Sequence, residues 1–156
     1  MTIDTAAAAA IADIEATHAA RETALSTSRA LTRQCANTIR AVHRAEFSQA
    51  QALLHEAGRI ATDLRIHLAN HPNLLFAGYT QDALKEYAEA ALVYAFLKQE
   101  PPPTPAQLNV EAAAYLNGMA EAASELRRAI LDGLRHGEVE RGERLLTMMD
   151  DVYSML

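Results

Sequence analysis

Two pairs of glutamates have a spacing that suits acid–base or metal chemistry. The members of each pair are three or four residues apart, which makes them neighbours on one face of a helix. The pairs are Glu86 with Glu89 and Glu121 with Glu125. The first pair runs into an unbroken apolar stretch, residues 90–97, which is typical of a buried helix. Two carboxylates beside a buried stripe destabilise a fold unless they are paired or bind a cation.

Carboxylates that converge from two helices would form a site for a hard cation. Mg²⁺ and Mn²⁺ prefer oxygen ligands, whereas converging acids without a cation repel one another and raise their pKa values. A cation held there would polarise a phosphodiester, and one carboxylate would act as general base toward the attacking water. Two simpler interpretations stay open. The first pair would lie at an exposed helix N-terminus, which favours acids, and the second would belong to a solvated polar stripe.

A stripe of arginines is the second chemical feature of the sequence. Its members are spaced by four, seven and four residues, and they are Arg29, Arg33, Arg40 and Arg44. On a helix they occupy a sector of about 60°, and no acid interrupts the stripe. Contacts to phosphate groups need such a one-sign surface, although an ordinary solvated helix face is the alternative. Only 5% of the residues are aromatic, so stacking on bases is not supported.

Long helices must position these groups, because helix breakers are few and clustered. We expect N-caps at Ser48, Thr80 and Thr104, and a C-terminal glycine at Gly137. The expected helices cover about residues 3–44, 48–69, 80–98, 104–136 and 138–155.

The last of these helices carries an apolar seam with coiled-coil spacing. Its members are Leu145, Met149, Val152 and Leu156. The seam would pack on the chain's own bundle or form a subunit contact, and the two roles are compatible.

Composition sets the fold class. The chain has 156 residues, enough for one domain with one core, and its hydrophobic half is mostly Ala and Leu, which favour helices. We predict a single all-α domain over residues 1–156, a bundle of about five to seven long antiparallel helices. The net charge of −6 does not indicate nucleic-acid binding. A lone Cys35 excludes an intrachain disulfide. With no signal or membrane-spanning pattern visible, we expect a cytoplasmic protein that does not bind membranes.

Three segments, in this order, resemble translin and its relative translin-associated factor X. The second of these segments, residues 84–90, reads Leu-Lys-Glu-Tyr-Ala-Glu-Ala and is similar to a signature of that family. The order and spacing match from about residue 21 to the C-terminus. The segments are residues 21–29 with 39–44, residues 84–90, and residues 115–121 continuing into 124–128.

The resemblance implies a translin-like helical bundle that assembles into a hollow, octamer-like barrel and binds single-stranded RNA and DNA. In the factor X branch, acids on the inner wall bind Mg²⁺ and cut RNA. Glu86 and Glu89 match the acidic pair of that branch, and Glu125 matches a further glutamate. Glu121 stands where that branch carries Asp, which alters the reach of the carboxylate by one methylene. The non-catalytic translin branch generally lacks an acid there.

The predicted function is therefore a Mg²⁺-dependent (or Mn²⁺-dependent) endoribonuclease in a homo-oligomeric shell of compact, prokaryotic type. The four glutamates are the expected metal ligands and catalytic residues, and the four arginines are the expected nucleic-acid contacts. One alternative is a single-stranded nucleic-acid-binding oligomer without turnover. Another is an all-α nucleoside triphosphate pyrophosphohydrolase, which also uses Glu-x-x-Glu and a second acidic pair. The second pair here has a spacing of four instead of three.

Overall fold

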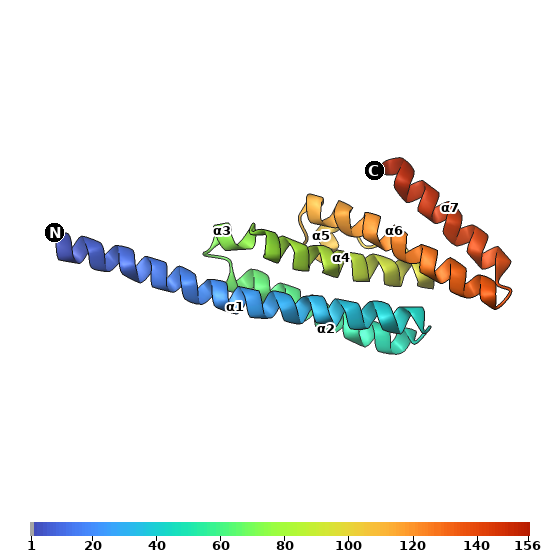
Figure 1. The fold of residues 1–156 in the computed structure, drawn as a ribbon, viewed down its shortest axis with the longest axis horizontal. Helices are drawn as coiled ribbons and strands as arrows, with labels where there is room; N and C mark the ends of the chain where they lie inside the picture. Colours follow the sequence, from blue (N-terminus) through green and yellow to red (C-terminus); the bar gives the residue numbers. More distant parts are fainter. Residues whose placement is uncertain (1) are drawn as a thin grey trace.

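The computed structural model describes residues 2–156, which form seven helices and no strand. Met1, the first residue of the expected domain, lies outside the described residues. Five helices are long. The other two have four residues each and lie in the connections. The all-α prediction is confirmed. In chain order the helices are α1 (Ile3–His43), α2 (Phe47–His67), α3 (Pro72–Leu75), α4 (Gly78–Lys98), α5 (Pro105–Leu108), α6 (Ala112–Arg135) and α7 (Val139–Met155), as Figure 1 shows.

Two of the three expected N-caps are wrong. Helix α2 begins after Glu46, because the tight turn at Ala45 (φ 58°) starts the helix before Ser48. Helix α4 begins after Ala77, and Thr80 lies inside its first turn. The buried Thr80 hydroxyl donates instead to the carbonyl of Leu74 at 2.8 Å, which joins α3 to α4.

The third expected cap is correct, but the helix it starts is short. Thr104 accepts from the backbone N–H of Gln107 in a reciprocal capping box. The predicted fourth helix then breaks at Asn109, whose φ of 52° lies in the left-handed region, and α6 starts afresh. Gly137, with φ 77°, follows the end of α6 as expected.

The long helices form a bundle in which α4 is central. Helices α1 and α2 form an antiparallel hairpin, and α7 folds back along α6 (Figure 1). The proline-containing connection, residues 99–111, returns the chain to the end where α4 begins. Helix α6 therefore runs in the same direction as α4 and α1, so neighbouring helices are not all antiparallel.

The core fixes α4 most firmly. Every residue from 88 to 97 is buried, as the apolar run predicts. Fully buried leucines from the neighbouring helices surround it, among them Leu31 of α1, Leu64 of α2 and Leu126 of α6. Each such side chain contributes about 1.5–3 kcal/mol by leaving water. Glu89 lies within this run and Glu86 precedes it on the same helix, so both are held on a rigid element.

The two ends of the chain relate differently to this core. The first half of α1 extends beyond the bundle as an arm, which we define as residues 3–19 (Figure 1). The seam of α7 packs on its own bundle through Leu145 and Val152, while Leu156 is exposed. No helix among residues 2–156 combines the length and the apolar character that crossing a membrane requires.

Candidate metal centre

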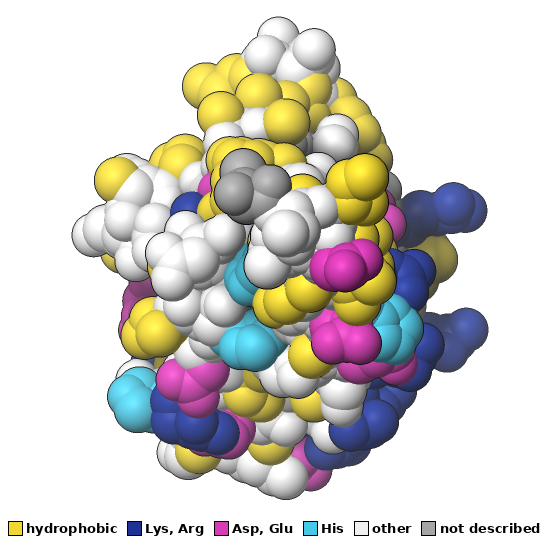
Figure 2. Space-filling view, turned by 90° about the vertical axis from the view of Figure 1, so that its left-hand side faces the viewer, with side chains coloured by type: hydrophobic (Ala, Val, Ile, Leu, Met, Phe, Trp, Pro, Cys, Tyr) yellow, Lys and Arg dark blue, Asp and Glu magenta, His cyan; other side chains and the backbone are white. Residues whose placement is uncertain are grey.

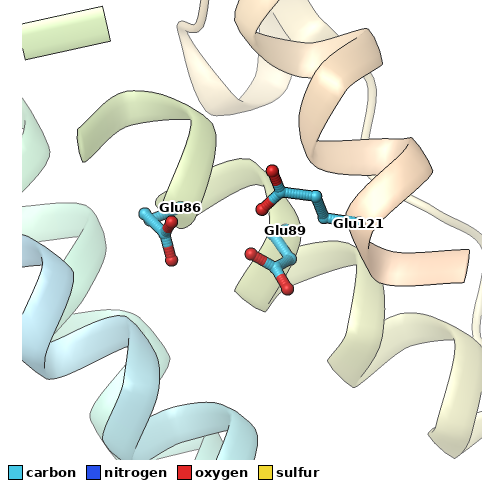
Figure 3. A group of neighbouring side chains, drawn as sticks. All are labelled: Glu86, Glu89 and Glu121. Carbon is cyan, nitrogen blue, oxygen red and sulfur yellow. The ribbon is translucent and has the colours of Figure 1, made fainter. Parts of the chain in front are cut away.

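Three of the four predicted glutamates meet between α4 and α6. Figure 3 shows Glu86 and Glu89 on α4 and Glu121 on α6 turned toward one space. One carboxylate oxygen from each lies within 4.8 Å of those of the other two. We call these three residues the carboxylate cluster. Oxygen ligands at such separations suit Mg²⁺ or Mn²⁺.

A glycine brings the two helices close enough for this contact. Gly118 is buried one turn before Glu121. A β-carbon at Gly118 would lie 2.8 Å from the carbonyl oxygen of Lys85 and 3.0 Å from the amide nitrogen of Glu89. These are backbone atoms, so a side chain there would push α6 away from α4. The absence of a side chain at Gly118 is therefore what places Glu121 beside Glu89.

The cluster is electrostatically strained around Glu89, which is only 6% exposed. Burial raises the pKa of Glu89 to about 8, helped by the charge of Glu86, a hydrogen bond with Glu121 and the charges of Glu121 and Glu125. At neutral pH this carboxyl therefore keeps a proton. A divalent cation would relieve the same repulsion, so the donor set fits a hard cation.

A lysine that the sequence analysis did not assign also enters the cluster. The Nζ atom of Lys85 donates to both carboxylate oxygens of Glu121, at 2.7 and 2.8 Å, and lies 3.0 Å from Glu86 Oε1. Burial works against the charge of Lys85, but hydrogen bonds to Glu121 and Glu86 raise its pKa. This ammonium group therefore neutralises part of the acidic charge.

The fourth glutamate has a different partner. Glu125 accepts a hydrogen bond at 2.5 Å from Nε2 of His43, whose side chain is 3% exposed. The charge of Glu125 still helps to raise the pKa of Glu89. The sequence did not indicate His43 as a site residue, because His43 is at the end of α1, 82 residues before its partner Glu125.

Cys35 of α1 faces the same region and is fully buried. Burial, followed by the charges of Glu86 and Glu89, raises the pKa of its thiol. The thiol thus stays protonated at neutral pH and contributes an apolar wall.

The arginine stripe lies on the surface of α1, and all four members are exposed. Arg40 donates to the side chain of Asn37 at 2.6 Å, and Arg44 pairs with Glu46 at 2.7 Å. Arg29 and Arg33 form no ion pair within residues 2–156. Viewed from the N-terminal end of α1, Lys and Arg side chains gather on one flank of the molecule (Figure 2).

Comparisons with known proteins give a consistent result. No family model matches the chain. An uncharacterised protein of Methanocaldococcus jannaschii is 30% identical over 138 residues, which are 87% of this chain. The chain spans only 61% of the length of that relative.

Three solved structures are similar along nearly the whole chain. Apo-NeC3PO superposes with a TM-score of 0.88 at 19% identity, covering 98% of this chain and 80% of its own. AfC3PO gives 0.85 at 27% identity, and AfC3PO in complex with duplex RNA gives 0.87 at 28%; both cover 94% of this chain and 75% of their own.

These likenesses first define a class, an all-α protein with the fold of the C3PO proteins. C3PO proteins are related to translin and translin-associated factor X, so this chain has the translin-family fold. The resemblance indicated by the three sequence segments is thereby confirmed.

Proposed function

We propose that this chain is a Mg²⁺-dependent endoribonuclease that binds RNA and works within a homo-oligomer. The observation that carries the proposal is the carboxylate cluster, with oxygens of Glu86, Glu89 and Glu121 within 4.8 Å of one another. A buried acid with a raised pKa, as Glu89 is, destabilises the fold, and such groups are frequent at functional sites. The likeness to AfC3PO, which has been solved with duplex RNA, supports the RNA-binding part of this function.

Each acidic residue has a role in this proposal. Glu86, Glu89 and Glu121 would hold Mg²⁺ or Mn²⁺, which when bound polarises the scissile phosphodiester. Glu125 accepts the proton of the attacking water as general base. His43 donates to Glu125 and so fixes the position of its carboxylate. Lys85 stabilises negative charge that develops on the phosphate, because its ammonium group already lies among the carboxylates.

The arginine stripe binds the backbone of the RNA. AfC3PO has been solved with duplex RNA, so duplex RNA is a candidate ligand alongside the single strands that the sequence predicts. Phosphate contacts would make binding sensitive to salt. Self-association, for which an octamer-like shell is the expectation, would enclose the cluster and shield the exposed apolar residues of the arm.

The test compares cleavage of end-labelled single-stranded and duplex RNA by the native protein, Glu86→Gln and Glu89→Gln. Each incubation is run with Mg²⁺, with Mn²⁺ and with a chelator. We expect both variants to lose at least about a hundredfold in rate. Glu140→Gln is the matched control, because Glu140 is exposed on α7 and lies outside the cluster. Equal cleavage by the native protein and both variants would sink the assignment.

Lys85 favours a second candidate, an RNA-binding oligomer without turnover. Its ammonium group bridges Glu86 and Glu121 without a cation, as a purely structural cluster would require. Intact RNA after incubation with Mg²⁺, together with salt-sensitive binding, would support this candidate. Under either function, Arg33→Glu combined with Arg40→Glu should abolish RNA binding.

A further inference from the structure

An open pocket of about 530 Å³ lies between α1 and the first turns of α4. It is separate from the carboxylate cluster and shares none of its residues. Both helices contribute polar side chains to its lining. These are Ser28, Arg29, Thr32 and Arg33 from α1, and Tyr79 and Asp82 from α4.

Two hydroxyl groups in this lining have no hydrogen-bond partner within the described part of the chain. They are Ser28 Oγ and Tyr79 OH, both buried atoms, and Ser28 as a whole is only 5% exposed. Leaving a buried polar group unpaired destabilises a fold, and native proteins contain few such groups. Acceptor oxygens of a ligand that enters the pocket deeply enough to reach them would supply the partners that these hydroxyls lack.

The charges around the pocket identify the kind of ligand. Arg29 and Arg33 are one helical turn apart, and neither forms an ion pair within residues 2–156. Asp82 is exposed and is the only acid in the lining, so the arginines outnumber it. A phosphate group offers several acceptor oxygens around one anionic centre. It can therefore serve two guanidinium groups and two hydroxyls together.

The pocket and the carboxylate cluster share helix α4, which carries Asp82 of the pocket and Glu86 and Glu89 of the cluster. Asp82 precedes Glu86 by four residues on α4, which corresponds to about 6 Å along the helix axis. On α1, Thr32 precedes Cys35, whose thiol is close enough for Glu86 and Glu89 to raise its pKa. A polymer that runs along this side would therefore meet both sites.

We propose that this pocket binds a phosphate group of RNA next to the carboxylate cluster. The RNA part of the statement rests on the proposed function, whereas phosphate binding does not. The group is either the terminal 5′-phosphate or a phosphodiester within the chain, since both present the same anionic oxygens.

The first experiment uses inorganic phosphate and thermal unfolding, with chloride at equal ionic strength as reference. Phosphate should raise the Tm of the native protein by about 3 °C at saturating concentration. Arg29→Gln combined with Arg33→Gln should remove this rise. Arg144→Gln, which changes an exposed arginine of α7, should keep it. An equal rise in the double variant and the native protein would overturn the proposal.

The hydroxyls give a second variant that separates binding from structure. In Ser28→Ala combined with Tyr79→Phe, no hydrogen bond of the free protein is lost, so the Tm without phosphate should not fall. The rise caused by phosphate should shrink by at least half. A variant that is destabilised without phosphate but responds to it fully would show that the hydroxyls serve only the fold, and would contradict the proposal.

RNA binding then distinguishes the two sources of phosphate. Oligonucleotides with a 5′-phosphate or a 5′-hydroxyl are bound in the presence of a chelator, so that no cleavage is needed. A preference of about tenfold for the 5′-phosphate, lost in the arginine double variant, assigns the terminal group. Equal weakening of both RNAs by about tenfold assigns an internal phosphodiester. Unchanged binding of both RNAs by the double variant would reject the pocket even if cleavage is observed. Absence of cleavage alone would reject only the nuclease.

Discussion

At the level of one residue, Glu89 shows that the arrangement of acids in the candidate site lowers the stability of the fold. Its carboxyl is buried among other acids, and its pKa is raised from 4.5 to about 8. An acid with a raised pKa binds its proton more tightly in the folded than in the unfolded chain. The free energy of unfolding therefore falls as the pH rises from about 4.5 to about 8.

Glu89→Gln should remove this pH dependence, because glutamine keeps the shape of the side chain without its charge. We expect the variant to exceed the native protein in stability at pH 8 by about 1–3 kcal/mol when no divalent cation is present. Urea denaturation at pH 5 and pH 8 in a chelator measures the difference. Glu140→Gln serves as the exposed control. The same pH dependence in Glu89→Gln and the native protein would contradict the raised pKa.

Lys85 supplies a second residue-level prediction. Without a divalent cation, Lys85→Gln should lower stability by about 1 kcal/mol, a modest value because Glu121 is about half exposed. Added Mg²⁺ should stabilise this variant more than the native protein, because a cation would then take over the neutralising role of the ammonium group. Thermal unfolding with and without Mg²⁺ decides the matter. Equal stabilisation of both proteins would mean that Lys85 and the cation do not share one site.

These residues also show how far the sequence predicts the site. The glutamates were predictable, because their spacing repeats on a helix and the apolar run marks one pair as buried. Lys85 and His43 were not, because their partners Glu121 and Glu125 lie 36 and 82 residues away. Only the packing of α6 against α4 and α1 brings these pairs together.

At the level of helices, the parallel pair α4 and α6 determines the geometry of the site. Breakers and apolar periodicity predicted the long helices, since both are local properties of the sequence. The break at Asn109 and the return of the chain through residues 99–111 depend on tertiary packing, so the relative direction of these helices was not predictable. Their close approach depends on Gly118.

Gly118→Ala should therefore separate α4 from α6. We expect a loss of about 1–3 kcal/mol in stability from the contacts with backbone atoms of α4, and weaker binding of Mg²⁺ because Glu121 moves away from Glu89. Gly142→Ala is the matched control on α7. Its β-carbon would meet side chains at 3.7 Å, an ordinary contact, so it should stabilise the protein by up to about 1 kcal/mol. Chemical denaturation and calorimetric titration with Mg²⁺ measure both effects. Similar behaviour of the two variants would contradict the role of the close approach.

For the molecule as a whole, the arm of α1 is the part that packing within the bundle does not stabilise. Ile3, Ile11 and Ile14 are exposed on it, and at 100° per residue they fall on one face. An isolated helix of this length is marginal in water, and an exposed apolar stripe indicates a contact with another molecule. A second copy of the chain is the occupant that the proposed oligomer supplies.

Ile11→Asp combined with Ile14→Asp should accordingly reduce the molar mass measured by light scattering after size exclusion, because charges would replace the apolar face of the arm. Ala12→Asp combined with Ala16→Asp places the same charges on the opposite face of the helix and should leave the mass unchanged. The Tm of the isoleucine variant should also become less dependent on protein concentration, since association stabilises the folded chain by mass action. An unchanged mass in the isoleucine variant would place the subunit contact elsewhere. A native protein that is monomeric at all concentrations would remove the oligomeric shell from the proposed function.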